Sequence, residues 1–200
     1  MGNGSFYNRA SSNSVQGVAP GDVPAYSNHR VFSFRGNYLY GIYTGIQWQC
    51  VEFARRWLLL RKSCTFPDID IAANIWNTLS YVERVTDGKK FRLIGHQNGS
   101  NNRPKQDSFL VYPRSRQMSV GHVAVITNID QDYVYIAEQN NNFHHWPSNY
   151  ARRAPISVRN GCYYIDDDFT LYGWMEIEGS NHLQPLKEAD ASMILEKYKG

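Results

Sequence analysis

Residues 47–57 read Gln47-Trp48-Gln49-Cys50-Val51-Glu52-Phe53-Ala54-Arg55-Arg56-Trp57, with a cysteine at the point where a helix is predicted to begin. Apolar residues recur at helical spacing after Cys50, so one face of the helix is expected to be buried, with Cys50 at its edge. Backbone N–H groups at a helix N-terminus favour the thiolate, which lowers the pKa of a cysteine placed there. The stretch therefore predicts either a nucleophilic cysteine or, as the alternative, a structural cysteine of the core.

Length and composition predict one globular domain with a single core. The chain has 200 residues, of which 42% are hydrophobic and 20% charged. Its net charge of +3 is spread out, with only short basic pairs such as Arg55-Arg56 and Arg152-Arg153, so nucleic acid is not an expected partner. No apolar stretch is long enough to cross a bilayer, so a membrane is not expected either.

The cysteines favour a reducing compartment. Cys50, Cys64 and Cys162 make an odd number at wide spacing, and no apolar N-terminal run suggests a signal peptide. We therefore expect a cytoplasmic protein. A metal site is not expected, because the adjacent His144 and His145 cannot both point inward along a strand and lack further ligands at suitable spacing.

The outer parts of the chain read as less regular than its middle. Residues 1–15 are rich in Ser, Asn and Gly and are predicted to form a disordered N-terminal arm. Short extended pieces follow around Pro20-Gly21, and residues 38–43 are predicted to form one strand. Residues 179–200 are predicted to be a C-terminal tail with a short amphipathic helix.

The middle of the chain predicts an α+β fold with N-terminal helices packed on an antiparallel sheet. A second helix is expected after Pro67 and Asp68, and the polar residues 87–105 are expected to form a surface loop. Four strands are then predicted over residues 108–112, 120–128, 133–139 and 171–178, with a fifth over 162–165. Helices first and strands afterwards are typical of α+β proteins.

Two neighbouring strands place polar residues together. A symmetric turn centred on Asp130 would set His122 directly opposite Glu138, with Cβ atoms about 5 Å apart on one face. A slip of one residue would send Glu138 to the other face. That face is otherwise apolar, with Ala124, Ile126, Val134 and Ile136.

A thiol, an imidazole and a carboxylate are the parts of a cysteine hydrolase. Cys50 would attack an amide carbon, His122 would carry the proton to the departing amine, and Glu138 would orient the imidazole. The backbone N–H of Cys50 and the side chain of Gln49 would hold the oxyanion. The alternatives are a hydrogen-bonded core histidine at 122 and a charge at the solvent-exposed end of a strand at 138.

Three blocks of this sequence resemble the motifs of the CHAP superfamily of cysteine/histidine-dependent amidohydrolases and peptidases: Trp48-Gln49-Cys50-Val51-Glu52-Phe53-Ala54-Arg55-Arg56, Val120-Gly121-His122-Val123-Ala124-Val125-Ile126 and Ile136-Ala137-Glu138-Gln139-Asn140. The stretches Gly17-Val18-Ala19-Pro20-Gly21, Asn160-Gly161-Cys162-Tyr163 and Tyr172-Gly173-Trp174-Met175 are similar to the amidase domain of glutathionylspermidine and trypanothione synthetase/amidases.

This resemblance implies a papain-like domain over residues 16–178 with Cys50, His122 and Glu138 as its catalytic residues. Arg55 matches a family arginine that would hold a glutathione carboxylate, with an exposed helix charge as the alternative. Trp48 and Asn140, like Gln49, match positions that border the substrate.

The resemblance further implies a thiol amidase that cleaves the amide between glutathione glycine and a polyamine through a Cys50 thioester, without a cofactor. The alternatives are a peptidoglycan amidase or endopeptidase of the same family and a catalytically inactive CHAP binding domain. Relatives carry a synthetase domain, which would be a partner if this chain is a fragment. The sequence departs from the family at residues 109–113 and in the loop 114–119, which leaves the preferred conjugate open.

Overall fold

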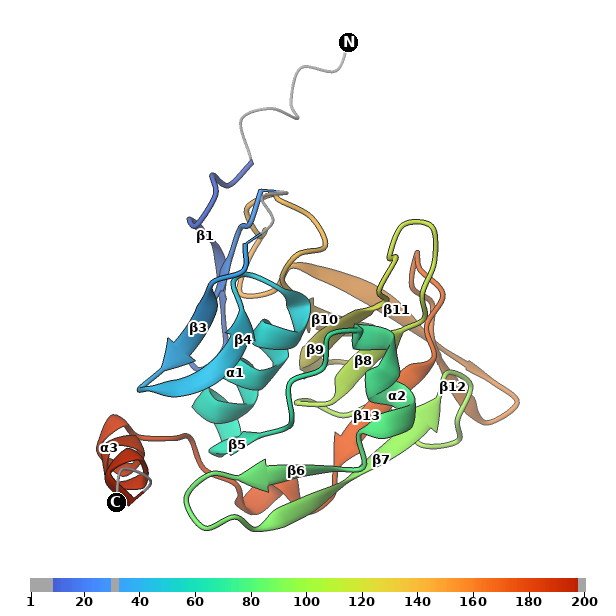
Figure 1. Cartoon of the computed structure of the whole chain (residues 1–200). Coiled ribbons are helices and arrows are strands. Elements are labelled where there is room, and N and C mark those ends of the chain that lie inside the picture. The colour runs from blue at the N-terminus through green and yellow to red at the C-terminus, as the bar shows by residue number, and fades with distance from the viewer. Residues whose placement is uncertain (1–8, 30–32, 198–200) are drawn as a thin grey trace.

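The computed structural model describes residues 9–29 and 33–197, which form an α+β fold (Figure 1). Among these residues, nine strands make one antiparallel sheet in the order β12-β11-β10-β9-β8-β13-β7-β6-β5. The strands are β5 (Cys64–Thr65), β6 (Tyr81–Arg84), β7 (Lys90–Gln97), β8 (Phe109–Tyr112), β9 (His122–Ile129), β10 (Tyr133–Ala137), β11 (Arg152–Arg159), β12 (Cys162–Ile165) and β13 (Gly173–Ile177). The predicted α+β class with an antiparallel sheet is confirmed.

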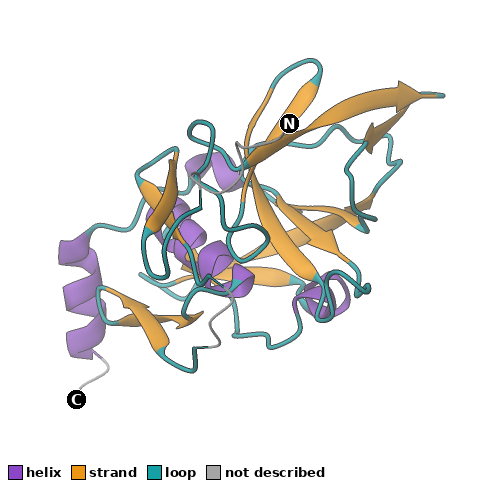
Figure 2. Cartoon of the chain, turned by 90° about the horizontal axis from the view of Figure 1, so that it is seen from above, coloured by secondary structure: helices purple, strands orange, loops and turns teal. Residues whose placement is uncertain are grey.

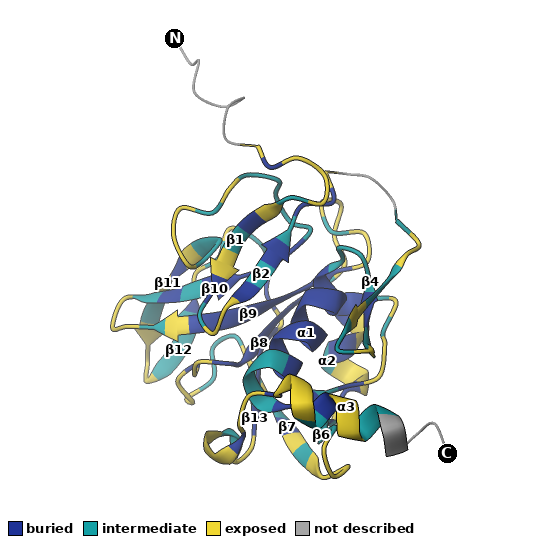
Figure 3. Cartoon of the chain, turned by 90° about the vertical axis from the view of Figure 1, so that its left-hand side faces the viewer, coloured by how far each residue is buried: buried dark blue, intermediate teal, exposed yellow. Residues whose placement is uncertain are grey.

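Helix α1 (Cys50–Lys62) lies at the centre of the molecule and is buried more completely than expected (Figure 3). Its residues from Cys50 to Leu59 are buried on every side, including the charged Glu52, Arg55 and Arg56. The apolar spacing predicted one buried face only, because charged residues on a helix usually face water. The helix ends at Ser63, whose left-handed conformation lets its N–H bond to the carbonyls of the last turn.

Two apolar clusters cover the two faces of the sheet. One joins α1 to Val123, Val125 and Ala137, and the other contains the predicted face of Ala124, Ile126, Val134 and Ile136. The side chains of β9 therefore alternate between two buried layers, whereas Tyr133 and Tyr135 of β10 are only partly buried. Strand β9 reads as a nearly continuous apolar run for this reason.

Two small hairpins precede α1. Strands β1 (Val15–Ala19) and β2 (Val23–Tyr26) pair around the expected Pro20-Gly21 turn. Strands β3 (Gly36–Leu39) and β4 (Ile42–Ile46) also form a hairpin, so the single strand predicted over residues 38–43 is wrong. Tyr40 and Gly41 both have positive φ values, 51° and 85°, and turn the chain back in the middle of that segment.

Several predictions differ from the structure in extent. Residues 87–105 contain β7 and are not only a loop, and β11 was not predicted. The second helix is a short 3₁₀ turn, η1 (Ala72–Asn74), followed by α2 (Ile75–Thr78). The predicted strand 162–165 has the observed bounds of β12.

The two ends of the described chain pack on the domain. Of the predicted disordered arm, residues 1–8 lie outside the described residues, but Ala10 is buried and its N–H bonds to the carbonyl of Phe143, so residues 9–15 differ from that expectation. The tail has a second short 3₁₀ turn, η2 (Ser180–His182), and then the expected helix α3 (Glu188–Lys197), which lies at the edge of the molecule in both views (Figures 1 and 2). In the described part of the chain, no helix is long and apolar enough to cross a membrane.

Candidate active site

Cys50 is the first residue of α1, as predicted, and follows the extended residue Gln49. The charge and hydrogen bond of His122, and the backbone N–H groups of Val123 and Val51, lower the pKa of its thiol. The first turn of α1 and the start of β9 are therefore both adjacent to the thiol of Cys50. Both supply donors that stabilise a negative charge on the sulfur.

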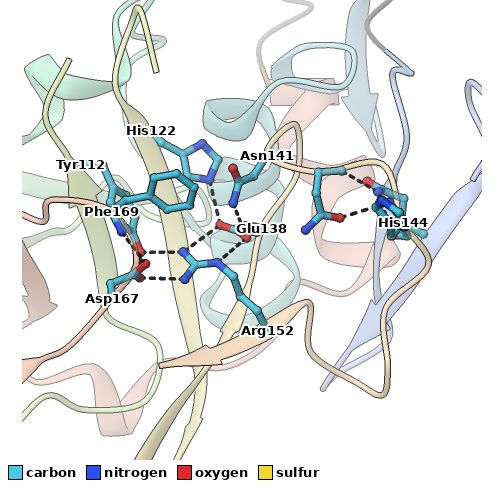
Figure 4. A network of polar contacts seen from close by, with 10 residues as sticks. Tyr112, His122, Glu138, Asn141, His144, Arg152, Asp167 and Phe169 are labelled. Carbon is cyan, nitrogen blue, oxygen red and sulfur yellow. Dashed lines mark hydrogen bonds and ion pairs between the residues drawn. The ribbon is translucent and has the colours of Figure 1, made fainter. Parts of the chain in front are cut away.

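His122 and Glu138 interact directly although their strands do not have the predicted register. The Nε2 atom of His122 lies 3.0 Å from Oε2 of Glu138, with both side chains almost fully buried. The other ring nitrogen, Nδ1, is therefore the one available to the thiol of Cys50. The structure brings the three predicted residues together in one row (Figure 4 shows His122 and Glu138).

A β-bulge in the β9–β10 hairpin sets this geometry. Near the turn Tyr135 pairs with Asn128, whereas the next residue, Ile136, pairs with Ile126, so Thr127 is an extra residue. Without it, Glu138 would point to the face opposite His122, because side chains alternate along a strand.

The prediction that His122 and Glu138 share a face is confirmed. The prediction that they pair directly is wrong, because Ala137 pairs with Val125, which takes the next residue toward Ala124.

The charges of the thiol and the imidazole stabilise one another. Burial alone would raise the pKa of Cys50, but the charge and hydrogen bond of His122 outweigh it and lower the thiol pKa. Burial alone would lower the pKa of His122, but the charge and hydrogen bond of Cys50 and those of Glu138 raise it. The pair therefore favours thiolate and imidazolium at neutral pH.

A partly buried arginine behind Glu138 is not indicated by the sequence. Arg152 on β11 donates from Nε to Oε1 of Glu138 at 2.7 Å, and Asn141 donates to the same oxygen at 2.8 Å (Figure 4). Burial alone would raise the pKa of Glu138, but the charge of Arg152 and the hydrogen bond of His122 hold it well below its usual range. The sequence shows Arg152 only as part of the basic pair Arg152-Arg153. Arg152 pairs with Ile136 and therefore lies on the same face of the sheet as Glu138. This placement can be known only from the register of the sheet.

The predicted oxyanion residue Gln49 is held in place by Asn140. The Nδ2 atom of Asn140 donates to Oε1 of Gln49 at 2.6 Å, and its Oδ1 accepts from Asn28 at 2.7 Å. No described residue accepts a hydrogen bond from Nε2 of Gln49. This donor and the backbone N–H of Cys50 are the groups that the sequence predicted for an oxyanion.

A second buried network fixes the start of α1 and was also missed. Glu52 is fully buried and accepts hydrogen bonds from Arg56, Gln139, Thr44 and Asn37. Gln139 also donates to the carbonyl of Gln49 at 3.2 Å. The residue after Glu138 is thereby tied to the residue before Cys50.

The other two predicted substrate-binding residues lie outside the main cleft. Arg55 is 7% exposed, donates to the carbonyl of Phe66 and faces Asp68 at 3.7 Å, so it is not an exposed helix charge. Trp48 stacks on Tyr26 with ring centroids 4.1 Å apart and lines a smaller neighbouring pocket.

The candidate nucleophile opens into a cleft of about 680 Å³. Segments from both sides of α1 and from the loops before β9 and after β10 form its walls: Asn28, Ser33, Phe34, Ile46, Gln49, Cys50, Val51, Glu52, Asp68, Ile69, Asp70, Ala72, Gln117, Met118, Ser119, Val120, Gly121, His122, Asn140, Asn141 and Phe143. This volume lies within the usual range for small-molecule sites, about 300–1,000 Å³.

Among the described residues, no group of three His, Cys, Asp or Glu side chains could hold a metal ion. His144 lies in the loop after β10, where it pairs with Arg9.

Comparison with known proteins identifies the family to which the chain belongs. The model of the CHAP domain family matches residues 41–140. The chain is 39% identical to trypanothione synthetase of Crithidia fasciculata, covering 82% of this chain and 26% of that protein. It is 30% identical to the bifunctional glutathionylspermidine synthetase/amidase of Escherichia coli (strain K12), covering 97% of this chain and 34% of that protein. The chain thus spans about a quarter to a third of the length of these relatives.

Proposed function

Because this chain belongs to the CHAP domain family, we propose that it is a cysteine amidase that hydrolyses the amide between the glycine carboxyl of glutathione and an amine of a polyamine. Its relation to the glutathionylspermidine and trypanothione enzymes supports this substrate class. The observation that carries the proposal is the row of Cys50, His122 and Glu138 at the edge of a cleft.

In the proposed reaction, the Cys50 thiolate attacks the amide carbon while the Cys50 N–H and the Gln49 amide bind the oxyanion. The C–N bond breaks as imidazolium His122 gives its proton to the amine. The amine departs, and the glutathionyl group stays on Cys50 as a thioester. Water then attacks the thioester, His122 takes its proton, and the thiolate departs. Glu138 keeps the ring oriented through both steps.

The lining of the cleft supports a linear, cationic amine as the leaving group. Apolar contacts for methylene groups come from Ile69, Met118 and Val120. The carboxylates of Asp68 and Asp70 line the same cleft. We also propose a reducing, cytoplasmic setting, since the cysteines of the described residues are free and the reaction needs Cys50 reduced.

The decisive experiment incubates the protein with glutathionylspermidine and with muropeptides in parallel and quantifies released amines. We expect free glutathione and spermidine, and no product from the muropeptides. Cys50→Ala serves as the control for contaminating hydrolases. Release from muropeptides alone would establish the peptidoglycan amidase instead, and no release from either would favour an inactive binding domain.

A further inference from the structure

We propose that Arg152 is a positioning residue that keeps Glu138 ionised and thereby sets the pH range in which Cys50 and His122 hold their charges. This inference rests on the proposed function only in taking these residues as the catalytic ones.

The contact between Arg152 and Glu138 has the geometry of a two-point clamp. Nε of Arg152 lies 2.7 Å from Oε1 of Glu138, and Nη2 lies 3.3 Å from Oε2. Bidentate pairs of this kind fix a carboxylate in orientation as well as in charge. Oε2 is also the oxygen that faces His122, so the arginine and the imidazole share one carboxylate.

The arginine is itself held from the opposite side. Its Nη1 lies 2.7 Å from Oδ2 of Asp167, whose side chain is fully buried. The hydroxyl of Tyr112 donates to the same Asp167 oxygen and accepts from Nη2 of Arg152, both at 2.9 Å. Burial raises the pKa of Tyr112 well above its usual value, so this phenol stays neutral. Arg152 therefore stands between two buried carboxylates.

The charged groups of the site form an alternating row. Cys50 from α1 is negative, His122 from β9 positive, Glu138 at the end of β10 negative, Arg152 from β11 positive, and Asp167 after β12 negative. Tyr112 from β8 and the amide of Asn141 are the neutral groups that face them. Each buried charge thus has an opposite charge beside it, which is the condition for keeping ions in a protein interior.

Loss of the cation would leave the buried carboxylate of Glu138 without the charge of Arg152. Burial would then raise the pKa of Glu138, because the charge of Arg152 no longer offsets it. Glu138 would then be neutral for part of the neutral pH range, and His122 would lose the anion that stabilises its charge. The thiolate of Cys50 would form at higher pH as a consequence, by about 1 pH unit for the loss of one close charge.

The test is the pH dependence of alkylation of Cys50 by iodoacetamide, followed by mass spectrometry of the Cys50 peptide. For Arg152→Met we expect the midpoint to rise by about 1 pH unit, so that alkylation at a fixed pH below both midpoints slows about tenfold. The matched control is Arg153→Met. Arg153 is the next residue on β11, is exposed on the other face and lies over the ring of Tyr133, so its loss should leave the midpoint unchanged.

An unchanged midpoint in folded Arg152→Met would overturn the proposal. If that variant does not fold, Asp167→Asn provides the test, since it removes the second carboxylate beside Arg152 and leaves the contact with Glu138 in place. We expect no rise in its midpoint, and a tenfold slower alkylation there would show that the network acts only through packing. Alkylation needs no substrate, so failure to hydrolyse glutathionylspermidine would reject the proposed substrate without touching this result.

Discussion

At the scale of single residues, Cys50 and Cys64 show how surroundings decide the chemistry of one residue type. Both are buried, but the pKa of Cys50 is lowered by His122 and by two backbone N–H groups, whereas no such groups lower the pKa of Cys64. Burial raises the pKa of Cys64 to about 12, and Arg84 offsets only part of that effect. We therefore expect Cys64 to be an unreactive thiol of the core and Cys50 to be a reactive one.

Replacement of Cys50 by alanine should abolish turnover without unfolding the protein. The substitution removes one sulfur atom beside an open cleft, so we expect the free energy of unfolding to change by about 1 kcal/mol or less. Urea unfolding and the glutathionylspermidine assay measure the two effects. Cys64→Ala is the control, and it should lose stability but retain turnover. Measurable turnover by Cys50→Ala would reject Cys50 as the nucleophile.

The pH dependence of kcat/KM should be a bell that includes neutral pH. Activity should rise as Cys50 loses its proton, at a pH below the ordinary thiol pKa, because His122 lowers that pKa. Activity should fall as His122 loses its proton, at a pH above the ordinary imidazole value, because Cys50 and Glu138 raise its pKa.

Glu138→Gln should move the alkaline limb of this bell to lower pH, because the imidazolium loses its anionic partner. Measurement of kcat/KM from acid to alkaline pH in both proteins tests this. An alkaline limb at the same pH in the variant would contradict the role of Glu138.

At the scale of elements, the start of β9 is set by a close approach of backbone. Gly121 has a φ of +73°, and an added Cβ would lie 2.6 Å from both the Cβ of Ala73 and the carbonyl oxygen of Tyr112. The next residue is His122, so any shift that relieves this contact displaces the imidazole. The glycine thus couples the packing of η1 to the site.

Gly121→Ala should therefore cost both stability and activity. We expect a loss of about 2–4 kcal/mol in unfolding free energy, from backbone strain and overpacking together, and at least a tenfold loss in kcat. Gly161→Ala is a matched control, because Gly161 has a similar φ of +78° but open space around its Cβ position. It should cost about 1 kcal/mol and no activity. Equal effects of the two variants would show that strain alone matters.

Elements with strong apolar periodicity could be predicted from the sequence, and those without it could not. Helix α1 and strands β9 and β10 have long apolar patterns that match their buried positions. Strand β7 buries only Leu93, and β11 begins with two arginines, so neither has a pattern that distinguishes it from a loop.

The three candidate catalytic residues could be predicted because each lies in a local motif. Arg152 could not be predicted, because its role depends on a pairing between strands and on a carboxylate in a distant turn. The bulge at Thr127 is another such feature, since an extra residue in a hairpin leaves no mark in the apolar pattern.

At the scale of the whole molecule, the two ends of the described chain have different relations to the site. The N-terminal segment lies beside it, with Asn13 accepting a hydrogen bond from Trp48 at 2.8 Å and Ala10 bonded to Phe143 of the cleft wall. Helix α3 instead packs through Ala191 in a small cluster with Leu59, away from the cleft.

Deletion of residues 1–13 should therefore lower activity more than it lowers stability. Trp48, which lies two residues before Cys50, would lose its acceptor, and the loop after β10 would lose its contacts with Ala10, so the walls of the cleft would be less well fixed. We expect KM to rise about tenfold, measured beside urea unfolding. Deletion of residues 188–200 is the control and should do the reverse, with stability reduced by about 2 kcal/mol for the exposed apolar contacts and kcat/KM unchanged. If the N-terminal deletion left KM unchanged, this segment would be a structural appendage and not part of the cleft wall.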